Sequence, residues 1–355
     1  MKKIIYIIFA IIFISCAAFF KSDEKLINYV DPFIGSGGHG HVFVGANVPF
    51  GGVQVGPTNF NKGWDWSSSY HHTDSIVKGF CHINVSGTGM SDLGELTIMP
   101  ATGDLKTGAG TQQNHMAGYS SLYRKNKEFA TAGYYKVHLE RYDIDVELTA
   151  TERVGLHNYI FPEAEKSRII IDLGEGSADR PTETYIKKVN DTLFEGHRFS
   201  TGWARDQREY FSLIISKPVS DFIIYDRHKK FKGIERKGDY VKGFLEFSTE
   251  KDEKIMVKMG ISTVSSKNAL ENMMIELPHW DFERVKKNAE EKWENELAKI
   301  KIKTKDKKKK RVFYTAMYHT MIAPNLYHDL NGEYRGTDKV VYKDSSFTNY
   351  TLFSL

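Results

Sequence analysis

Apolar and polar positions alternate along the middle of the chain, and this alternation predicts β-strands. Tyr135, Val137 and Leu139 are interleaved with charged or polar residues, and positions 144–149 repeat the pattern. A period of two places apolar side chains on one face of a strand. Further β-rich runs cover 168–173, 210–216, 221–225, 243–248 and 255–262. Because no segment of helical period interrupts them, these runs favour an antiparallel β-sandwich.

The chain on either side of this region has different patterns. Positions 28–100 are rich in Gly, His, Asp and aromatic residues with few alternating runs, which is typical of long ordered loops and short strands. After Asp281, a suitable helix N-cap, apolar residues recur every three or four positions and predict an amphipathic helix. Its apolar stripe consists of Phe282, Val285, Ala289, Trp293 and Leu297.

The last part of the chain predicts the beginning of a helical domain. Positions 312–322 are apolar on more than one side and stop before Pro324, which predicts a helix buried among other helices. The Lys- and Arg-rich run 305–311 is short and lies between the two predicted helices, which argues against a nucleic-acid patch. Positions 350–355 are apolar, and two helices cannot bury a core of their own. We therefore expect either a longer protein or a partner that completes a helical domain.

Composition excludes several classes of protein. With 41% hydrophobic and 13% aromatic residues, the chain can fill a core and is not a disordered polymer. The 49 Lys and Arg are balanced by 45 Asp and Glu, so the one-sided basicity of a nucleic-acid-binding protein is missing. Two cysteines, Cys16 and Cys81, do not suffice for a disulfide framework.

The N-terminus predicts export. Two lysines precede an apolar run from position 4 to 14, which suits a signal peptide over 1–20 and is shorter than the about 20 residues of a membrane span. The letters FISC at 13–16 resemble a bacterial lipobox, so Cys16 is the predicted lipidation site, and we expect a lipoprotein of the periplasm, outer membrane or cell surface. An ordinary signal peptide with an incidental cysteine and an uncleaved anchor are the alternatives.

The densest group of chemically active residue types lies between positions 35 and 95. The segment GSGGHGH at 35–41 favours a tight loop over a phosphate cradle, because no Lys-Ser or Lys-Thr follows it. Trp64, Asp65 and Trp66 are followed by His71, and aromatic rings beside carboxylates suit a carbohydrate cleft. The alternative is that both tryptophans belong to the core.

Metal binding and serine hydrolysis find little support in the same segment. Its possible metal ligands are His71, His72, His82, Asp74, Asp92 and Glu95. None has the spacing of a zinc site, and the glycines at 87, 89 and 94 argue against a helix that would align Asp92 with Glu95. The segment SGTG at 86–89 lacks the Gly-x-Ser-x-Gly form of a nucleophile elbow.

Ordered motifs along nearly all of the chain after the predicted signal peptide resemble glycoside hydrolase family 92. They include YVDPFIG at 29–35, GGHGHVFVGA at 37–46, VPFG at 48–51, GWDW at 63–66, SGTG at 86–89, GYY at 133–135, LTAT at 148–151, GW at 202–203, FYTA at 313–316, YHT at 318–320 and YRG at 334–336. The resemblance implies an exo-acting, inverting, calcium-dependent α-mannosidase that acts on mannose-containing glycans. It also implies an N-terminal β-sandwich, a helical linker and an (α/α)6 barrel.

By analogy with the family, the loop that carries Trp64 helps to form the sugar site. The residues carried over as substrate-binding candidates are Trp64, Asp65, Trp66, His71, Gly38, His39, Arg335 and Asp338. The resemblance does not decide whether Trp64 or Trp66 stacks on the sugar. It places the general acid, the general base and most calcium ligands beyond position 355, so no catalytic residue is assigned in this chain and its metal ligands stay unknown.

These expectations combine into a mainly β fold with an incomplete helical part. We predict a β-sandwich domain over 25–275, a helical linker over 279–304 and a truncated start of the (α/α)6 barrel over 305–355. The predicted function is that of an α-mannosidase part that is inactive alone. The alternative is a non-catalytic carbohydrate-binding β-sandwich protein. In either case no nucleic acid is expected as a partner, a membrane only through a lipid anchor, and the oligomeric state is left open.

Overall fold

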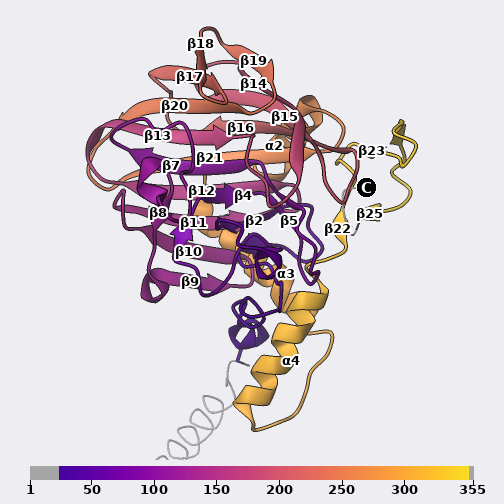
Figure 1. Ribbon diagram of the computed structural model, residues 1–355. Coiled ribbons are helices and arrows are strands. Elements are labelled where there is room, and N and C mark those ends of the chain that lie inside the picture. Colours follow the sequence, from indigo (N-terminus) through magenta and orange to yellow (C-terminus); the bar gives the residue numbers. More distant parts are fainter. Residues whose placement is uncertain (1–23, 352–355) are drawn as a thin grey trace, which may run out of the picture.

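The computed structural model describes residues 24–351, and two large antiparallel sheets form its framework (Figure 1). The first sheet has the order β1-β2-β4-β7-β13-β20-β17-β18. Its strands are β1 (Ala46–Asn47), β2 (Gln54–Thr58), β4 (Gly79–Cys81), β7 (Thr97–Thr102), β13 (Ala164–Asp172), β17 (Asp221–Asp226), β18 (Lys229–Phe231) and β20 (Val241–Thr249). The prediction of a mainly β protein is confirmed.

The second sheet has the order β19-β14-β15-β16-β21-β12-β11-β10-β9. Its strands are β9 (Glu128–Thr131), β10 (Tyr134–Leu139), β11 (Ile144–Ala150), β12 (Val154–Phe161), β14 (Arg180–Lys188), β15 (Leu193–Thr201), β16 (Gln207–Ile215), β19 (Glu235–Gly238) and β21 (Glu253–Ser262). Val137 of β10 faces Val146 of β11, and both are buried in a core cluster that also takes side chains from the first sheet. The alternation seen in the sequence therefore marks the inward-facing positions.

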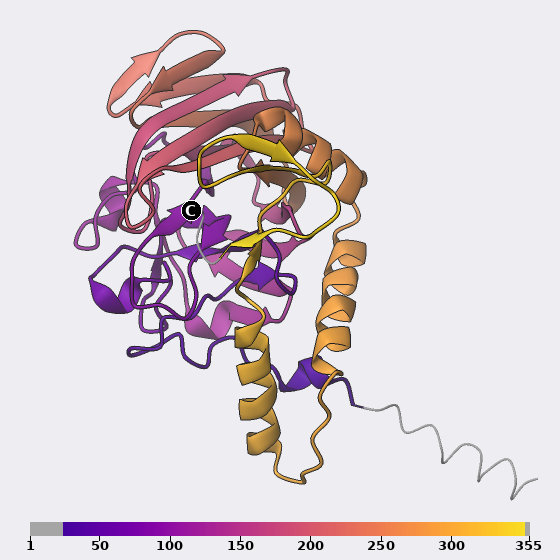
Figure 2. The same ribbon diagram turned by 90° about the vertical axis from the view of Figure 1, so that its right-hand side faces the viewer.

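Short elements connect and flank the two sheets. They are the 3-10 turns η1 (Leu26–Tyr29), η2 (Trp64–Trp66), η3 (His115–Ala117) and η4 (Lys125–Lys127), and the strand pairs β3 (Ile76–Val77) with β8 (Ser121–Leu122), β5 (Ile83–Asn84) with β6 (Leu93–Glu95), β22 (Asn325–Leu326) with β25 (Tyr350–Thr351), and β23 (Glu333–Arg335) with β24 (Val341–Lys343). Figure 2 looks at the end of the sheets that carries the last two pairs.

Three α-helices lie in the described part of the chain: α2 (Ser266–Glu276), α3 (Phe282–Leu297) and α4 (Lys307–Thr320). The predicted stripe of α3 is buried, and Asp281 caps the helix by accepting a hydrogen bond from the backbone NH of Arg284 at 3.0 Å. The Trp293 indole of this stripe donates to the carbonyl of Asn47 at 2.8 Å. The stripe thus fixes α3 against the sheets and against α4, with which it shares a second core cluster.

Three expectations about the helices were wrong. Helix α2 was missed inside the stretch expected to be β-sandwich; its apolar residues are spread around the helix, and Ile275 is 66% exposed. The cationic run does not lie between helices, because Asp306 accepts from the NH of Lys308 and begins α4 inside that run. Helix α4 is not enclosed by the described residues, since Val312 is 55% exposed. The domain bounds stay predictions.

Two of the sequence calls concern cysteines. Cys81 is a free, buried thiol whose pKa is raised by burial. Cys16 and the rest of the predicted signal peptide lie outside the described residues. Within residues 24–351 no helix is long and apolar enough to cross a membrane.

Candidate functional site

Trp64 is presented on the surface by a tight turn. It begins η2 directly after Gly63, whose φ of +111° is a backbone conformation that side-chain-bearing residues rarely adopt. The Ser67 NH closes the turn by donating to the Trp64 carbonyl at 3.2 Å. The side chain remains 57% exposed. An exposed indole on a fixed turn offers a flat apolar face to a ligand.

Trp66, two residues later, is engaged within the protein. Its ring stacks on His71 with centroids 4.2 Å apart, and its indole NH donates to Asp74 Oδ2 at 3.0 Å. The ammonium of Lys62 pairs with the same carboxylate oxygen at 2.8 Å. Of the two tryptophans in this turn, Trp64 is therefore the one with an indole face open to a ligand.

One carboxylate and two imidazoles lie beside the Trp64 side chain. Asp65 Oδ1 lies 2.6 Å from His39 Nδ1 and 3.7 Å from His41 Nε2. The hydrogen bond from His39 is the main cause that lowers the pKa of the Asp65 carboxyl. The His41 ring packs edge-on against the Trp64 indole, with the ring centroids 4.2 Å apart. Within residues 24–351, His41 Nε2 has no hydrogen-bond partner. His41 was not among the predicted site residues, although it belongs to the same Gly-rich segment as His39.

The Gly-rich segment is a tight loop that packs beneath this group. Gly38 has a φ of +56°, and its carbonyl lies 3.3 Å from His71 Nε2. A Cβ at Gly40 would come within 1.9 Å of the Gly35 carbonyl oxygen. Gly89 also lies close to the indole: a Cβ there would be 2.5 Å from Trp64 Nε1. Glycines therefore allow the close approaches that hold His39, Asp65 and Trp64 together.

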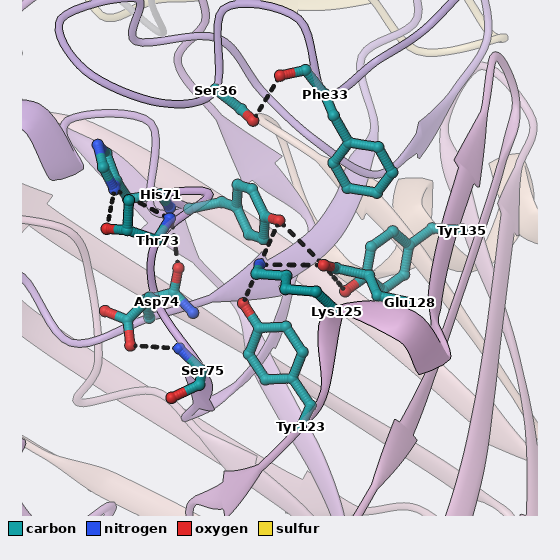
Figure 3. A network of polar contacts seen from close by, with 12 residues as sticks. Phe33, Ser36, His71, Thr73, Asp74, Ser75, Tyr123, Lys125, Glu128 and Tyr135 are labelled. Carbon is teal, nitrogen blue, oxygen red and sulfur yellow. Dashed lines mark hydrogen bonds and ion pairs between the residues drawn. The ribbon is translucent and has the colours of Figure 1, made fainter.

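A buried polar cluster around Lys125 and Glu128 anchors the loop that carries His71 and Asp74 (Figure 3). Lys125 Nζ donates to the Tyr70 hydroxyl at 2.7 Å and to Glu128 Oε2 at 3.0 Å, while the Tyr135 hydroxyl donates to Glu128 Oε1 at 2.8 Å. Burial lowers the pKa of Lys125 and raises the pKa of Tyr70, and Tyr70 is followed directly by His71. The cluster connects the site loop to β9 and β10.

Arg335 and Asp338 belong to a different place. Arg335 ends β23 and donates from Nη2 to Asp206 Oδ2 at 2.6 Å, whereas Asp338 accepts a short hydrogen bond from the Tyr342 hydroxyl. Among the described residues, no hydrogen bond, ion pair or ring contact joins either of them to the group around Trp64. The structure therefore brings Trp64, Asp65, His39 and Gly38 together, but not Arg335 or Asp338 with them.

The remaining carboxylates of the segment are structural partners. Glu95 and Asp179 both pair with Arg198 Nη1, at 2.6 and 2.5 Å, and all three side chains are fully buried. Burial raises the pKa of Glu95 well above its ordinary value. Within residues 24–351, no three His, Cys, Asp or Glu side chains form a group that could hold a metal ion. Sequence reasoning missed Arg198, because its partners are far away along the chain.

Comparisons with known proteins agree on one family. The model of the glycosyl hydrolase family 92 N-terminal domain matches residues 29–262, and that of the family's catalytic domain matches residues 268–355. The structure of the family GH92 alpha-mannosidase BT3965 from Bacteroides thetaiotaomicron superposes with a TM-score of 0.89 and 33% identity, covering 92% of this chain and 45% of that one. The same enzyme in complex with mannoimidazole superposes with a TM-score of 0.89 and 34% identity, covering 92% and 44%.

A curated relative adds a statement about location. An uncharacterized secreted glycosidase of Arthroderma benhamiae is 25% identical over 352 residues, which covers 88% of this chain and 43% of that protein. The chain therefore spans less than half the length of the relatives described here.

Proposed function

The chain belongs to glycosyl hydrolase family 92, and on that premise we propose that it is part of an exported α-mannosidase that degrades mannose-containing glycans. The printed name of the Bacteroides relative, an alpha-mannosidase at 33% identity, supports the reaction, and its complex with mannoimidazole supports the sugar. We further propose exo action with inversion of the anomeric centre, which the family resemblance implies.

The observation that carries this proposal is the exposed indole of Trp64 beside a carboxylate. The apolar face of a pyranose ring packs on the indole, and Asp65, with its pKa lowered by His39, accepts hydrogen bonds from sugar hydroxyls. Because His39 donates through Nδ1, its exposed Nε2 stays free to contact a further hydroxyl. We propose Gly38 as part of the loop floor, and Trp66 and His71 as a stack that fixes the loop from which Trp64 projects.

The domain arrangement is proposed along the same lines. We interpret the two sheets as a β-sandwich domain over 25–275, residues 279–304 as a linker and 305–355 as the start of an (α/α)6 barrel. The two matched family models, which meet between 262 and 268, support a boundary near α2. The Trp64 platform then lends a binding surface to a site whose reacting groups lie in the catalytic domain.

An inverting glycosidase needs a general acid and a general base about 6.5–9.5 Å apart, with a water molecule between the base and the sugar. We assign neither role to a residue of this chain, and we propose that the chain alone is inactive. Calcium dependence is proposed from the family. The described residues do not fit a calcium site, because no three His, Cys, Asp or Glu side chains among them form a group that could hold a metal ion.

Calorimetry and a turnover assay test the proposal. Methyl α-mannoside should bind the full chain, and Trp64→Ala should weaken binding about fivefold, because a stacked ring contributes on the order of 1 kcal/mol. Phe129→Ala, which removes another exposed aromatic ring, is the matched control and should bind as the wild type does. Equal affinities of the Trp64→Ala variant and the wild type would refute the platform.

Turnover of α-1,2-mannobiose with calcium tests the missing acid and base. We expect no turnover above background with this chain and measurable turnover with a full-length family member. A rate constant of about 1 per second or more for this chain alone would contradict the proposed inactivity. Binding without turnover, even when a separately produced catalytic domain is added, would favour the non-catalytic carbohydrate-binding protein.

Export, with lipid attachment at Cys16, is proposed from the N-terminal sequence. The description of the Arthroderma relative as secreted supports export. Labelling with a fatty-acid analogue should mark the wild type and leave a Cys16→Ser variant unlabelled. An unlabelled wild type would reject the lipid anchor without affecting the catalytic proposal.

A further inference from the structure

A second exposed tryptophan borders a cavity of about 410 Å³ that the mannoside proposal does not use. Trp203 lies in the loop between β15 and β16 and is 62% exposed. The rest of the lining includes Arg335, the last residue of β23, and Thr337 and Lys339, which follow that strand. The cavity therefore combines an aromatic side chain with polar and cationic ones.

The loop that carries Trp203 is held in one conformation. The NH of Ala204 donates to Asp92 Oδ2 at 2.9 Å, and the NH of Gly202 donates to the Ala204 carbonyl at 3.0 Å. A Cβ at Gly202 would lie 2.6 Å from Asp92 Oδ1, so the loop packs closely on this buried carboxylate. The backbone that carries the indole is therefore preorganised, which reduces the entropy that a ligand would have to overcome.

Positive charge exceeds negative charge around the cavity. A single carboxylate, that of Asp206, pairs with Arg335 at 2.6 Å, Lys339 at 3.0 Å and Arg208 at 3.1 Å. These three cations lower the pKa of Asp206, so the carboxylate is ionised at neutral pH. One negative charge cannot neutralise three positive ones, and the surplus is available to a ligand.

The guanidinium of Arg205 adds a further positive charge. Arg205 lines the cavity and is exposed, and within residues 24–351 its side chain has no hydrogen-bond or ion-pair partner. Asp338 lies in the adjoining hollow, where it accepts from Tyr342 and is not paired with any of these cations. Arg205 and Lys339 are therefore the groups most accessible to an incoming anion.

We propose that this cavity binds an anionic pyranoside, with the sugar ring on Trp203 and the anionic group between Arg205 and Lys339. A phosphate ester and a carboxylate are the two sources of such a group, and both accept charge-assisted hydrogen bonds from guanidinium and ammonium donors. The site is separate from the Trp64 platform and does not depend on the proposed hydrolysis. It gives the protein a preference for charged glycans at a position that a neutral mannoside leaves unused.

Calorimetry with the full chain at pH 7.5 and low salt tests this inference. The probes are mannose, mannose 6-phosphate, glucuronic acid and inorganic phosphate. We expect at least one anionic sugar to bind about tenfold more tightly than mannose, and the advantage to shrink when NaCl is raised from about 50 to 500 mM. If neither anionic sugar binds more tightly than mannose, the inference is overturned, while the mannoside proposal is left intact.

Three variants separate the parts of the site. Arg205→Gln should reduce the affinity for the anionic sugar about tenfold and change mannose binding less than twofold, and Trp203→Ala should weaken the anionic sugar by a similar factor. Arg284→Gln, an exposed arginine on α3, is the matched control and should change nothing. Inorganic phosphate that binds as tightly as the sugar phosphate, with no effect of Trp203→Ala, would refute recognition of a sugar. Unchanged affinity in Arg205→Gln would refute the anion contact.

Discussion

Two buried histidines predict that the protein loses stability in mild acid. His82 follows β4 in the first sheet and His157 lies in β12 of the second, and both side chains are fully buried. Their Nε2 atoms are 2.9 Å apart, so one nitrogen must donate and the other must accept. His82 Nδ1 lies 2.7 Å from the Leu96 carbonyl, which can only accept, so His82 donates there and accepts from His157. The Tyr159 hydroxyl then donates to His157 Nδ1 at 2.8 Å.

This chain of hydrogen bonds requires both imidazoles to be neutral. Burial lowers the pKa of His82 from 6.5 to about 4 and lowers that of His157 well below its ordinary value. An unfolded chain takes up these protons near pH 6.5, whereas the folded protein does not. The free energy of unfolding should therefore be unaffected by this pair above about pH 7 and fall between pH 6.5 and 4. For His82 alone the loss reaches about 3 kcal/mol at pH 4.

The assay is urea unfolding followed by circular dichroism from pH 7.5 to 4. Because carboxylates also titrate in this range, the informative quantity is the difference between the wild type and a variant without the two titrating groups. The variant His82→Gln with His157→Gln should be less stable than the wild type at pH 7.5 but lose at least about 3 kcal/mol less on acidification to pH 4, because it removes the contributions of both histidines. His228→Gln, which removes an exposed histidine, is the control and should follow the wild type. Parallel pH profiles of the double variant and the wild type would refute the reasoning.

Substitutions at three further positions test how the platform and its supports are built. Gly89→Ala should displace the Trp64 indole and weaken mannoside binding about fivefold with a change in unfolding temperature below about 2 °C; calorimetry that finds unchanged affinity would contradict the close contact. Glu128→Gln should cost about 2 kcal/mol in urea unfolding, because Lys125 loses its buried counter-charge, and a cost near zero would count against the cluster. Asp281→Ala should cost about 1 kcal/mol by loss of the N-cap of α3, whereas Asp281→Asn should restore most of it.

The elements that could be predicted from the sequence are those whose pattern is local. Period-two alternation located β10 and β11, and β-rich runs located β13, β16, β17, β20 and β21. The steps of three and four located α3 with its cap and its buried stripe. Helix α2 escaped because Met274 and Ile275 are apolar yet exposed, which blurs the stripe that marks a helix. The start of α4 was missed because its first five residues are all Lys or Arg, so no apolar position marks the helical period before Val312.

The candidate site was predictable only where its residues are close together in the sequence. Trp64 and Trp66 are neighbours in the sequence with the same chemistry, so no local pattern could say which one is exposed. The difference comes from His71 and Asp74, which engage Trp66 through contacts that form only in the folded loop. The contact between Arg335 and Asp206 spans 129 positions, and a single sequence gives no signal for a pair at that separation.

Both aromatic platforms depend on the same device, a buried carboxylate that accepts hydrogen bonds from the loop. Asp74 accepts from the Trp66 indole, and Asp92 accepts from the NH of Ala204, while each is at most 2% exposed. A buried carboxylate costs free energy unless hydrogen-bond donors satisfy it. If either loop opened, its carboxylate would lose a donor, so the closed loop is favoured. The same desolvation raises the pKa of Asp92. Asp74 and Asp92, two of the acidic residues that looked like metal ligands in the sequence, therefore act by fixing the loops: Asp74 holds the indole of Trp66 two residues after Trp64, and Asp92 holds the backbone directly after Trp203.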